Sequence, residues 1–380
     1  MNFVKTTWAA GAAAASLGLT AVSVAHADPL SAPAMTPPLS ANANPTSFDL
    51  GGSKIYVTGQ LTGLGISQDN SVPGDKKNRA DLSNAQIEVQ KADGVFQFYV
   101  QAGDYSTPSL GTPYFKAADL PDLTYKAVPV AFIKLQPNAS FNIMAGKLPT
   151  LIGAEYTFTF ENMNIARGLL WNQEPAVSRG VQANYTTGPW AVSVSVNDGY
   201  YSNRFTTGST LITYTVGKED TVAFAGSAQF KKTSKTGFAT PLAQNNGDIF
   251  NLIWTHIEGN WEVMPYLQYG RVPKSTKVGL PASGSTFGAA VLAKYNFTPT
   301  FSLAGRAEYI GSSGGTSLLY GPKSKAMSLT LTPTWQLKTF FIRGELNYTK
   351  LDKMAPGAGF GSSGLEDTQT RAMIETGVLF

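Results

Sequence analysis

From Ser53 to Phe380 the chain alternates apolar and polar residues in segment after segment, and the links between segments are alternately very short and long. A period of two is typical of β-strands whose two faces meet different surroundings. Tight links at 92–93, 187–188, 217–218, 259–260 and 298 separate long loops rich in Gly, Ser, Pro and Asp, such as 67–80, 105–125, 148–176, 271–283 and 351–367. A soluble β-sandwich does not sort its loops by length in this way. The pattern predicts an all-β fold, a single transmembrane antiparallel β-barrel of about 16 strands with short periplasmic turns and long external loops.

The predicted strands are close to the 9–11 residues that a tilted strand needs to cross a bilayer. An even strand number between about 14 and 18 is compatible with the pattern. Pro265 and Pro333 lie inside predicted strands, and each removes one ladder hydrogen bond. The predicted ranges are 53–66, 81–91, 94–104, 126–136, 140–147, 177–187, 189–198, 209–217, 219–231, 246–258, 260–270, 284–297, 299–311, 325–337, 339–350 and 368–380.

The first 27 residues have the features of a cleaved export signal. Lys5 provides a positive charge, residues 8–24 are rich in Ala, Leu and Val, and Ala25-His26-Ala27 matches a small-x-small cleavage site. A membrane anchor is the alternative, and it is disfavoured because the segment is Ala/Gly-rich, barely long enough to span, and ends at a cleavage site. We therefore expect a signal peptide at 1–27 and a mature chain that begins at Asp28.

Residues 28–50 differ in composition from the rest of the mature chain because they carry five prolines among Ala, Ser and Asn. Such a segment buries too little apolar surface to fold alone, so it predicts a flexible periplasmic tail. A plug inside the barrel is the alternative, but a plug needs a core of its own. The barrel itself is then expected over residues 51–380.

The last predicted strand, 368–380, alternates regularly and ends on the aromatic residue Phe380. This ending resembles the C-terminal signature by which the barrel-assembly machinery takes up its substrates. An ordinary β-domain that happens to end on Phe is the alternative. Together with the export signal, the ending predicts an outer-membrane location, with membrane lipid and the assembly machinery as partners and Phe380 as the assembly signal.

Charged side chains of both signs recur on the face expected to point inward. Ionised groups are costly in lipid, so a barrel interior that contains them is expected to be wet. They could form salt bridges that support the wall, or a ring that sorts solutes by charge. The expected lumen-lining residues are Glu88, Lys134, Glu262, Lys294, Arg306, Glu308, Arg343, Glu345, Arg371 and Glu375.

The longest loop, 148–176, is unusually rich in charged and aromatic residues for an external loop. A barrel of about 16 strands leaves an aqueous channel unless something narrows it. This loop is the third long one, and in general porins the third external loop folds inward. We expect it to form the constriction, with Arg167 facing Glu161; a surface loop at a subunit interface is the alternative. The expected constriction residues are Glu155, Glu161, Arg167, Trp171 and Glu174.

One stretch carries a resemblance to a known family. The sequence Gly146-Lys147-Leu148-Pro149-Thr150-Leu151-Ile152-Gly153-Ala154-Glu155, followed by 162–171, Glu174-Pro175 and Arg179-Gly180-Val181, resembles the beta-barrel porin-2 (OmpL-like) family. The resemblance covers about 50–380 and implies a pore in a Gram-negative outer membrane. Assembly as a homotrimer is implied by porins in general.

These features favour a porin that lets small hydrophilic solutes and ions diffuse through a water-filled channel. A substrate-specific channel for a sugar or small organic solute is the main alternative, and an adhesive or structural barrel is another. An enzyme is not expected, because the single histidine of the mature chain, His256, has no matching Ser or Asp arrangement. We expect no metal and no cofactor, since cysteine is absent and no ligand cluster has suitable spacing. The net charge of +4 is too small to indicate nucleic acid.

Overall fold

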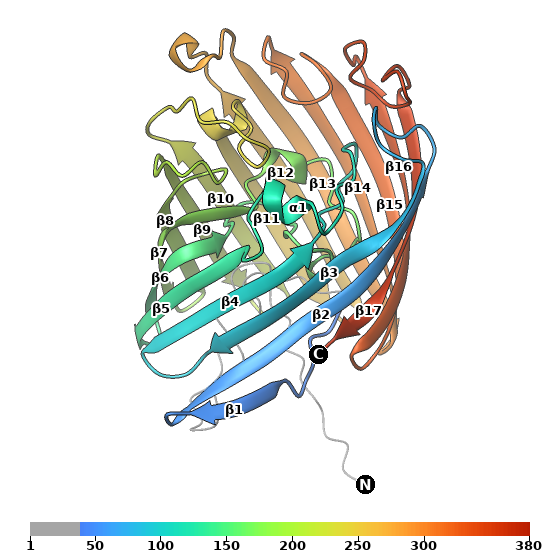
Figure 1. Ribbon diagram of the computed structural model, residues 1–380. Helices are drawn as coiled ribbons and strands as arrows, with labels where there is room; N and C mark the ends of the chain where they lie inside the picture. Colours follow the sequence, from blue (N-terminus) through green and yellow to red (C-terminus); the bar gives the residue numbers. More distant parts are fainter. Residues whose placement is uncertain (1–38) are drawn as a thin grey trace.

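In the computed structural model, which describes residues 39–380, sixteen antiparallel strands form a closed barrel (Figure 1). The expected signal peptide, 1–27, lies outside the described residues. The barrel strands are β2 (Ser53–Gln68), β3 (Asn78–Lys91), β4 (Phe96–Tyr105), β5 (Val130–Asn138), β6 (Phe141–Pro149), β7 (Val177–Thr187), β8 (Trp190–Asn197), β9 (Thr207–Val216), β10 (Asp220–Gln229), β11 (Asp248–Glu258), β12 (Trp261–Val272), β13 (Gly284–Thr298), β14 (Phe301–Gly314), β15 (Lys325–Leu337), β16 (Phe340–Asp352) and β17 (Thr368–Leu379).

Each strand pairs with the next one along the chain, and β17 pairs with β2 to close the sheet. The predicted fold class is therefore confirmed, and every predicted segment corresponds to one strand. Boundaries differ by a few residues; the largest shift is at β5, which begins at Val130 where we expected 126. Closure leaves no sheet edge within the barrel, as lipid surroundings require.

A seventeenth strand, β1 (Thr46–Leu50), lies outside the barrel at the tight-turn end (Figure 1). It forms a hairpin with the start of β2, from Leu50↔Ser53 to Thr46↔Val57. β1 and β17 pair with the same edge of β2, and β17 pairs with the later residues of that strand, from Gln60 to Gln68. The expectation of a flexible tail at 28–50 is therefore wrong for 46–50, because backbone pairing with β2 holds that segment; residues 28–38 lie outside the described part.

The C-terminal residue completes the seam just above this hairpin. The Gly59 N–H donates to the Phe380 carbonyl at 2.8 Å, and the Phe380 N–H donates to the Gly59 carbonyl at 2.9 Å. A side chain on Gly59 would lie within 3 Å of the Phe380 ring, so glycine leaves the room that this ring occupies. Phe380 itself is 47% exposed on the outer surface.

Outward-facing aromatic rings gather beside the tight turns. Trp190 contacts Tyr214 with ring centroids 4.6 Å apart, and Trp261 contacts Tyr295 at the same separation. Trp335 and Phe340 form a further pair. Rings in this position are typical of the girdle at a membrane–water interface.

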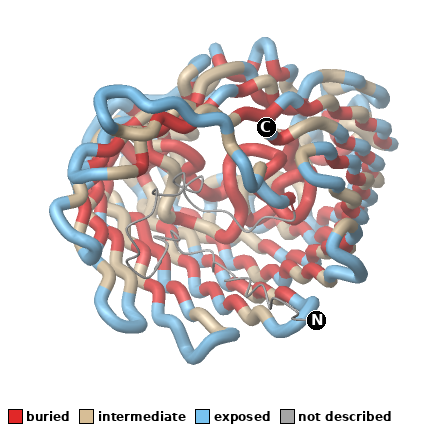
Figure 2. Tube along the Cα trace, turned by 90° about the horizontal axis from the view of Figure 1, so that it is seen from below, coloured by how far each residue is buried: buried red, intermediate tan, exposed pale blue. Residues whose placement is uncertain are grey.

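The interior is filled in part by inward-folded segments, which appear in Figure 2 as buried tubes within the ring of strands. They include the short helix α1 (Leu120–Leu123) and two 3₁₀ turns, η1 (Thr159–Glu161) and η2 (Trp171–Gln173). Two more 3₁₀ turns, η3 (Gln244–Asn246) and η4 (Thr276–Val278), lie in loops at the long-loop end. Between residues 39 and 380, helices long and apolar enough to cross a membrane do not occur.

Candidate functional site

Residues 148–176, here called the strap, connect β6 to β7 and lie against the inner face of the barrel. Most of their polar contacts with the barrel strands go to inward side chains of β12 and β14–β17, which we call the charged wall. One further contact joins Thr159 to Asn84 of β3. The charged wall and the strap form the candidate site.

Glu345 on β16 holds the middle of the strap by its backbone. Its two carboxylate oxygens accept the N–H groups of the consecutive residues Ile165, at 2.5 Å, and Ala166, at 3.1 Å. One residue earlier, the Asn164 side chain donates to Thr332 of β15 at 2.7 Å, and Thr332 donates to Glu345. Charge-assisted bonds of this kind are about twice as strong as neutral ones, so this carboxylate fixes the path of the strap.

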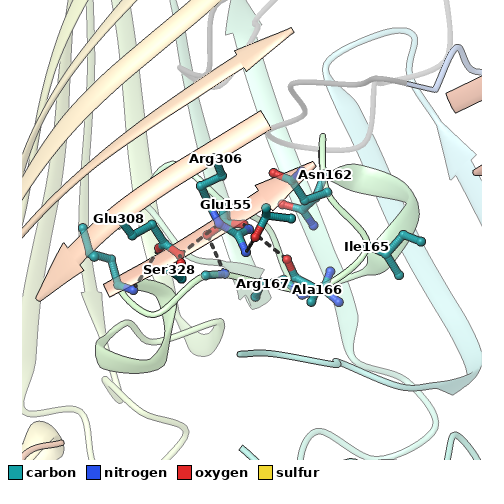
Figure 3. A network of polar contacts seen from close by, with 12 residues as sticks. Glu155, Asn162, Ile165, Ala166, Arg167, Arg306, Glu308 and Ser328 are labelled. Carbon is teal, nitrogen blue, oxygen red and sulfur yellow. Dashed lines mark hydrogen bonds and ion pairs between the residues drawn. The ribbon is translucent and has the colours of Figure 1, made fainter. Parts of the chain in front are cut away.

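Arg306 on β14 joins three groups at the centre of the site (Figure 3). It pairs with Glu155 of the strap at 2.5 Å and with Glu308 of its own strand at 3.0 Å. It also donates to the carbonyl of Ala166 at 2.8 Å. The side chains of Arg306 and Glu308 are 0% exposed. The triad is therefore buried in protein and does not line a water-filled space.

A second buried ion pair lies one strand pair further on. Arg343 on β16 binds Glu375 on β17 at 2.5 Å, and both side chains are 0% exposed. Arg343 also donates to the strap carbonyls of Thr159 and Asn162. The Thr159 hydroxyl donates to Glu375 at 2.5 Å, which ties the η1 turn to the same pair.

The end of the strap is attached to β12. The Gln268 side chain donates to the carbonyl of Leu170 at 3.1 Å and to the carboxyl group of Glu174 at 2.6 Å. Tyr266 donates to the same carboxyl oxygen at 3.3 Å. Gly153 lies so close to Glu174 that a Cβ at this position would collide with its carboxyl group, so the strap needs a glycine here.

Arg167 and Glu161 do not face each other across an opening. Arg167 is fully buried and donates from Nε and Nη2 to the carbonyl of Pro108. Glu161 accepts the N–H of Phe158 inside the strap itself. The hypothesis of an Arg167–Glu161 pair at an eyelet is therefore wrong, because each side chain is used to hold protein backbone.

Burial shifts the acid–base properties of these strap groups. It raises the pKa of Glu161 to about 8, opposed by the hydrogen bond from Phe158 and increased by the nearby charge of Glu88. Burial likewise raises the pKa of Glu174 well above its usual value. The pKa of Arg167 falls to about 10, again through burial. Removal from water disfavours whichever form carries the charge.

The strap is supported by a second inward loop, 106–129, between β4 and β5. Backbone bonds join Leu110 and Pro108 to Arg167, which makes a short bridge between the two loops. Arg371 on β17 donates to the carbonyls of Ser109 and Thr112 in this second loop. Arg371 thus contributes to the site indirectly, by holding the loop that holds the strap.

Four of the ten expected lining residues face inward and contact neither the strap nor the loop that supports it. Glu262 on β12 and Lys294 on β13 form an ion pair at 2.9 Å. Glu88 on β3 accepts a hydrogen bond from Thr58, and Lys134 on β5 is buried by the same inward orientation. Trp171, expected at the constriction, is partly buried in the η2 turn among the apolar residues of the strap region.

The opposite side of the interior, formed by β7, β8 and β9, is different in character. Its inward side chains carry no charge, and they hydrogen-bond to one another rather than to the strap. Asn184 accepts from Gln182 and Ser193, both at 2.7 Å. We call this surface the neutral wall; its polar members are Gln182, Asn184, Ser193, Ser195, Asn197, Thr207, Ser209 and Thr213.

Several residues that hold the strap were missed by the sequence reasoning. Gln268, Tyr266 and Thr332 are inward-facing neutral residues on strands, and alternation identified their face without distinguishing them from other wall positions. Pro108 and Thr159 act through loop backbone or a loop hydroxyl, where alternation gives no information. The one usable signal was the density of charge on β14, β16 and β17, which did mark the wall that receives the strap.

A sequence comparison assigns the family. The profile of the family described as "Putative beta-barrel porin-2, OmpL-like" matches residues 54–380, which is almost the whole barrel. The chain belongs to this family. A search of curated proteins finds no significant match.

Solved structures with the same architecture are outer-membrane proteins of low sequence identity. An anion-selective porin from Comamonas acidovorans aligns at a TM-score of 0.61 with 12% identity, covering 86% of this chain and 100% of that one. The outer membrane channel DcaP of Acinetobacter baumannii aligns at 0.60 with 10% identity, covering 88% and 100%. OmpF of Salmonella typhi aligns at 0.59 with 13% identity, again covering 88% and 100%. At these identities the likeness shows the fold, and the family places this porin-type barrel in an outer membrane.

Proposed function

We propose that this porin-type barrel forms a water-filled channel for passive diffusion of small hydrophilic solutes and ions, narrowed by the strap. The observation that carries the proposal is the seating of residues 148–176 inside a sixteen-strand barrel, where backbone and side chains are bonded to the charged wall. A barrel of this size encloses more space than its own side chains fill. An inward loop reduces that space without closing it.

The path of solutes is proposed to run between the strap and the neutral wall. The side-chain hydrogen bonds between the strap and the barrel strands go to β12 and β14–β17, apart from one between Thr159 and Asn84 of β3. Within residues 39–380, the side-chain amides and hydroxyls of β7–β9 bond to other wall groups and not to the strap; Tyr200, in the loop above β8 and β9, donates to the Gln173 carbonyl of the strap. A surface of amide and hydroxyl groups hydrogen-bonds to water and to hydrated solutes at little cost. In this account the buried ion pairs position the strap, and they do not act as a ring that sorts ions.

Planar-bilayer recordings combined with liposome swelling test the proposal. The purified, folded barrel should give discrete conductance steps, and vesicles should swell at rates that fall smoothly with the size of the added sugar. Absence of conductance from barrels shown to be folded would overturn the proposal and favour an adhesive or structural role. Faster swelling with one solute than with smaller solutes would overturn the proposal and favour a substrate-specific channel. No catalytic activity is proposed.

The orientation is proposed to place the tight turns in the periplasm and the long loops outside, after removal of a signal peptide at 1–27. This is the arrangement typical of bacterial barrels. A homotrimer is proposed as the assembled form; one of the similar structures, OmpT of Vibrio cholerae, is described in a trimer form. The barrel-assembly machinery is the proposed partner during insertion.

Phe380 is proposed to act as the assembly signal, and its position supports that role because it completes the seam at Gly59. Phe380→Ser should lower the amount of folded protein in the outer membrane several-fold, since the closing strand then lacks its terminal ring. Heat-modifiable mobility of outer-membrane fractions on gels measures the folded amount. Unchanged levels of folded barrel would contradict this role; Phe301→Ser, at another outward aromatic beside a tight turn, is the matched control.

A further inference from the structure

Three neighbouring loops at the long-loop end carry only basic charge. The loops 230–247, 271–283 and 315–324 contain seven lysines and arginines and neither Asp nor Glu: Lys231, Lys232, Lys235, Arg271, Lys274, Lys277 and Lys323. All except Lys232 are exposed. The other loops at this end each contain at least one acidic residue, and in 198–206 that residue, Asp198, pairs with Arg179. The basic charge is therefore concentrated above β10–β15.

These loops form one structure rather than three independent segments. Leu242 of the first loop, Val278 and Leu280 of the second, and Leu318 of the third pack into a single apolar cluster with Val272 of β12. The cluster keeps the like charges of the three loops close together. Repulsion among them is unfavourable, and it decreases when anions are bound between them.

On the strands just below, two more basic residues, Lys325 and Lys350, point outward, as does Arg271 at the end of β12. Arg271 follows Tyr269 by two residues on β12, Lys350 follows Tyr348 by two on β16, and Lys325 precedes Met327 by two on β15. Residues two apart on a strand share a face. Since Tyr269, Met327 and Tyr348 are exposed on the outer surface, the three basic residues face the same way.

The outward aromatic residues at this level mark a second membrane interface. Phe250, Tyr269 and Phe287 lie side by side in the register of β11, β12 and β13. On β12, Tyr269 is eight residues from Trp261 of the girdle beside the tight turns, about 26 Å along the strand or about 20 Å of height at the usual tilt of about 40°. Arg271, two residues further on, stands at a height of about 25 Å. An apolar band about 25 Å tall between two aromatic girdles is typical of outer-membrane barrels. Arg271, Lys325 and Lys350 therefore stand at the level of lipid headgroups.

We propose that this basic rim binds the phosphate groups of lipids in the adjacent outer leaflet. The basic rim is defined as Lys231, Lys235, Arg271, Lys274, Lys277, Lys323, Lys325 and Lys350. Two acidic residues share this face: Asp248, opposite Arg271 in the sheet register, and Asp352, opposite Lys325. Within residues 39–380 neither forms an ion pair with the rim, and Asp248 accepts the N–H of Gln229. Eight basic groups against two acidic ones leave a strongly positive face.

Lipid is the occupant that fits this geometry, because the three strand residues face out of the barrel, away from the solute path. Each basic residue close to an anionic membrane surface adds measurably to the attraction. The inference goes beyond the proposed channel function and depends only on its orientation, with the long loops outside.

The test uses a rim variant that combines Arg271→Gln, Lys325→Gln and Lys350→Gln. The control variant has the same change of charge and combines Lys76→Gln, Lys77→Gln and Lys116→Gln, in long loops that do not belong to the basic rim. Binding of fluorescent bisphosphorylated lipid A to the folded barrel in neutral detergent is measured. The rim variant should bind at least about tenfold more weakly than the unmodified chain, while the control changes little. The difference should disappear near 1 M salt, where charges are screened within about 3 Å.

Two outcomes would overturn the proposal. One is equal binding of lipid A by the rim variant and the unmodified chain. The other is complete displacement by a molar excess of inorganic phosphate, which would indicate a site for free anions instead. Conductance in neutral lipid is recorded for each variant, and unaltered steps show that a change in lipid binding is independent of the channel.

Discussion

The charged wall and the neutral wall belong to one sheet, and they treat their polar groups in opposite ways. On β14, β16 and β17, the inward charged side chains are buried and bond to the strap or to the loop that supports it, as Glu345 does with two consecutive N–H groups of the strap. On β7–β9, amides and hydroxyls bond to one another along the wall. Breaking a buried ion pair is costly because the remaining charge is left without a partner. The comparison indicates that charge on the inner face specifies which wall holds the strap.

The largest effect is expected from Arg306→Gln, which leaves both Glu155 and Glu308 without their cation. Removing one partner of a buried ion pair costs about 3–5 kcal/mol, so the strap should leave the charged wall for much of the time. Limited proteolysis should then cut within 148–176, and single-channel recordings should become noisier. Ser193→Ala on the neutral wall is the control, since it removes one hydrogen bond that the strap does not use. If the strap of Arg306→Gln resists protease as well as the strap of the unmodified chain, Arg306 does not hold the strap on the charged wall.

A smaller effect is expected from pH through Glu161. Burial raises the pKa of this group to about 8, whereas a free Glu titrates near 4.3. The seated strap therefore keeps a proton that the released strap gives up, and the free energy that holds the strap falls as pH rises from about 4.3 to about 8. Protease sensitivity of the strap should rise over that interval and level off above it. Two charged groups act on this pKa from nearby: Glu88 raises it and Arg167 lowers it.

Glu161→Gln provides the matched control for that pH dependence. It keeps an oxygen acceptor for the N–H of Phe158 and removes the proton equilibrium. Its protease sensitivity should rise less across the same interval, because Glu174, whose pKa burial also raises, is then left to respond to pH. If protease sensitivity rises with pH as steeply in Glu161→Gln as in the unmodified chain, a group other than Glu161 causes the pH dependence.

The smallest effect is expected from a single charge on the neutral wall. Ser195→Asp adds a carboxylate that the Asn197 amide is placed to bond, since it already donates to Ser195 at 2.6 Å. If solutes pass along this wall, the zero-current potential in a salt gradient should shift toward cations by a few-fold in permeability ratio. Ser195→Asn, which is neutral, should leave the potential unchanged. Equal potentials for the two variants would mean that the path does not follow β7–β9.

The barrel was predictable from sequence because its determinants are local and repetitive. Alternation gave the face of every strand, and loop length gave the order of turns and loops, so β15 was placed at Lys325–Leu337 without error. β1 was missed because five prolines upstream dominated the composition, while its pairing with β2 depends on backbone bonds that carry no sequence pattern. The same locality explains why the short turns followed directly from sequence.

The site was only half predictable. The inward charged positions on β14, β16 and β17 followed from alternation, and all of them contact the strap or the loop that supports it. Alternation did not predict the strap groups that these side chains bind, because many of those groups are backbone atoms, such as the N–H of Ile165 and the carbonyl of Thr159. Every residue has these groups, so composition cannot single them out. For that reason Arg167 and Glu161 were paired wrongly.

The most direct measurement joins the strap to the charged wall covalently. The chain contains no cysteine, so Asn164→Cys with Thr332→Cys introduces two unique thiols at positions whose side chains now share a 2.7 Å hydrogen bond. A short bifunctional thiol reagent is added during single-channel recording of this double variant. We predict that cross-linking goes to completion and leaves the conductance unchanged, because the strap already lies on this wall. Failure to cross-link, or a change in conductance as the link forms, would contradict the account.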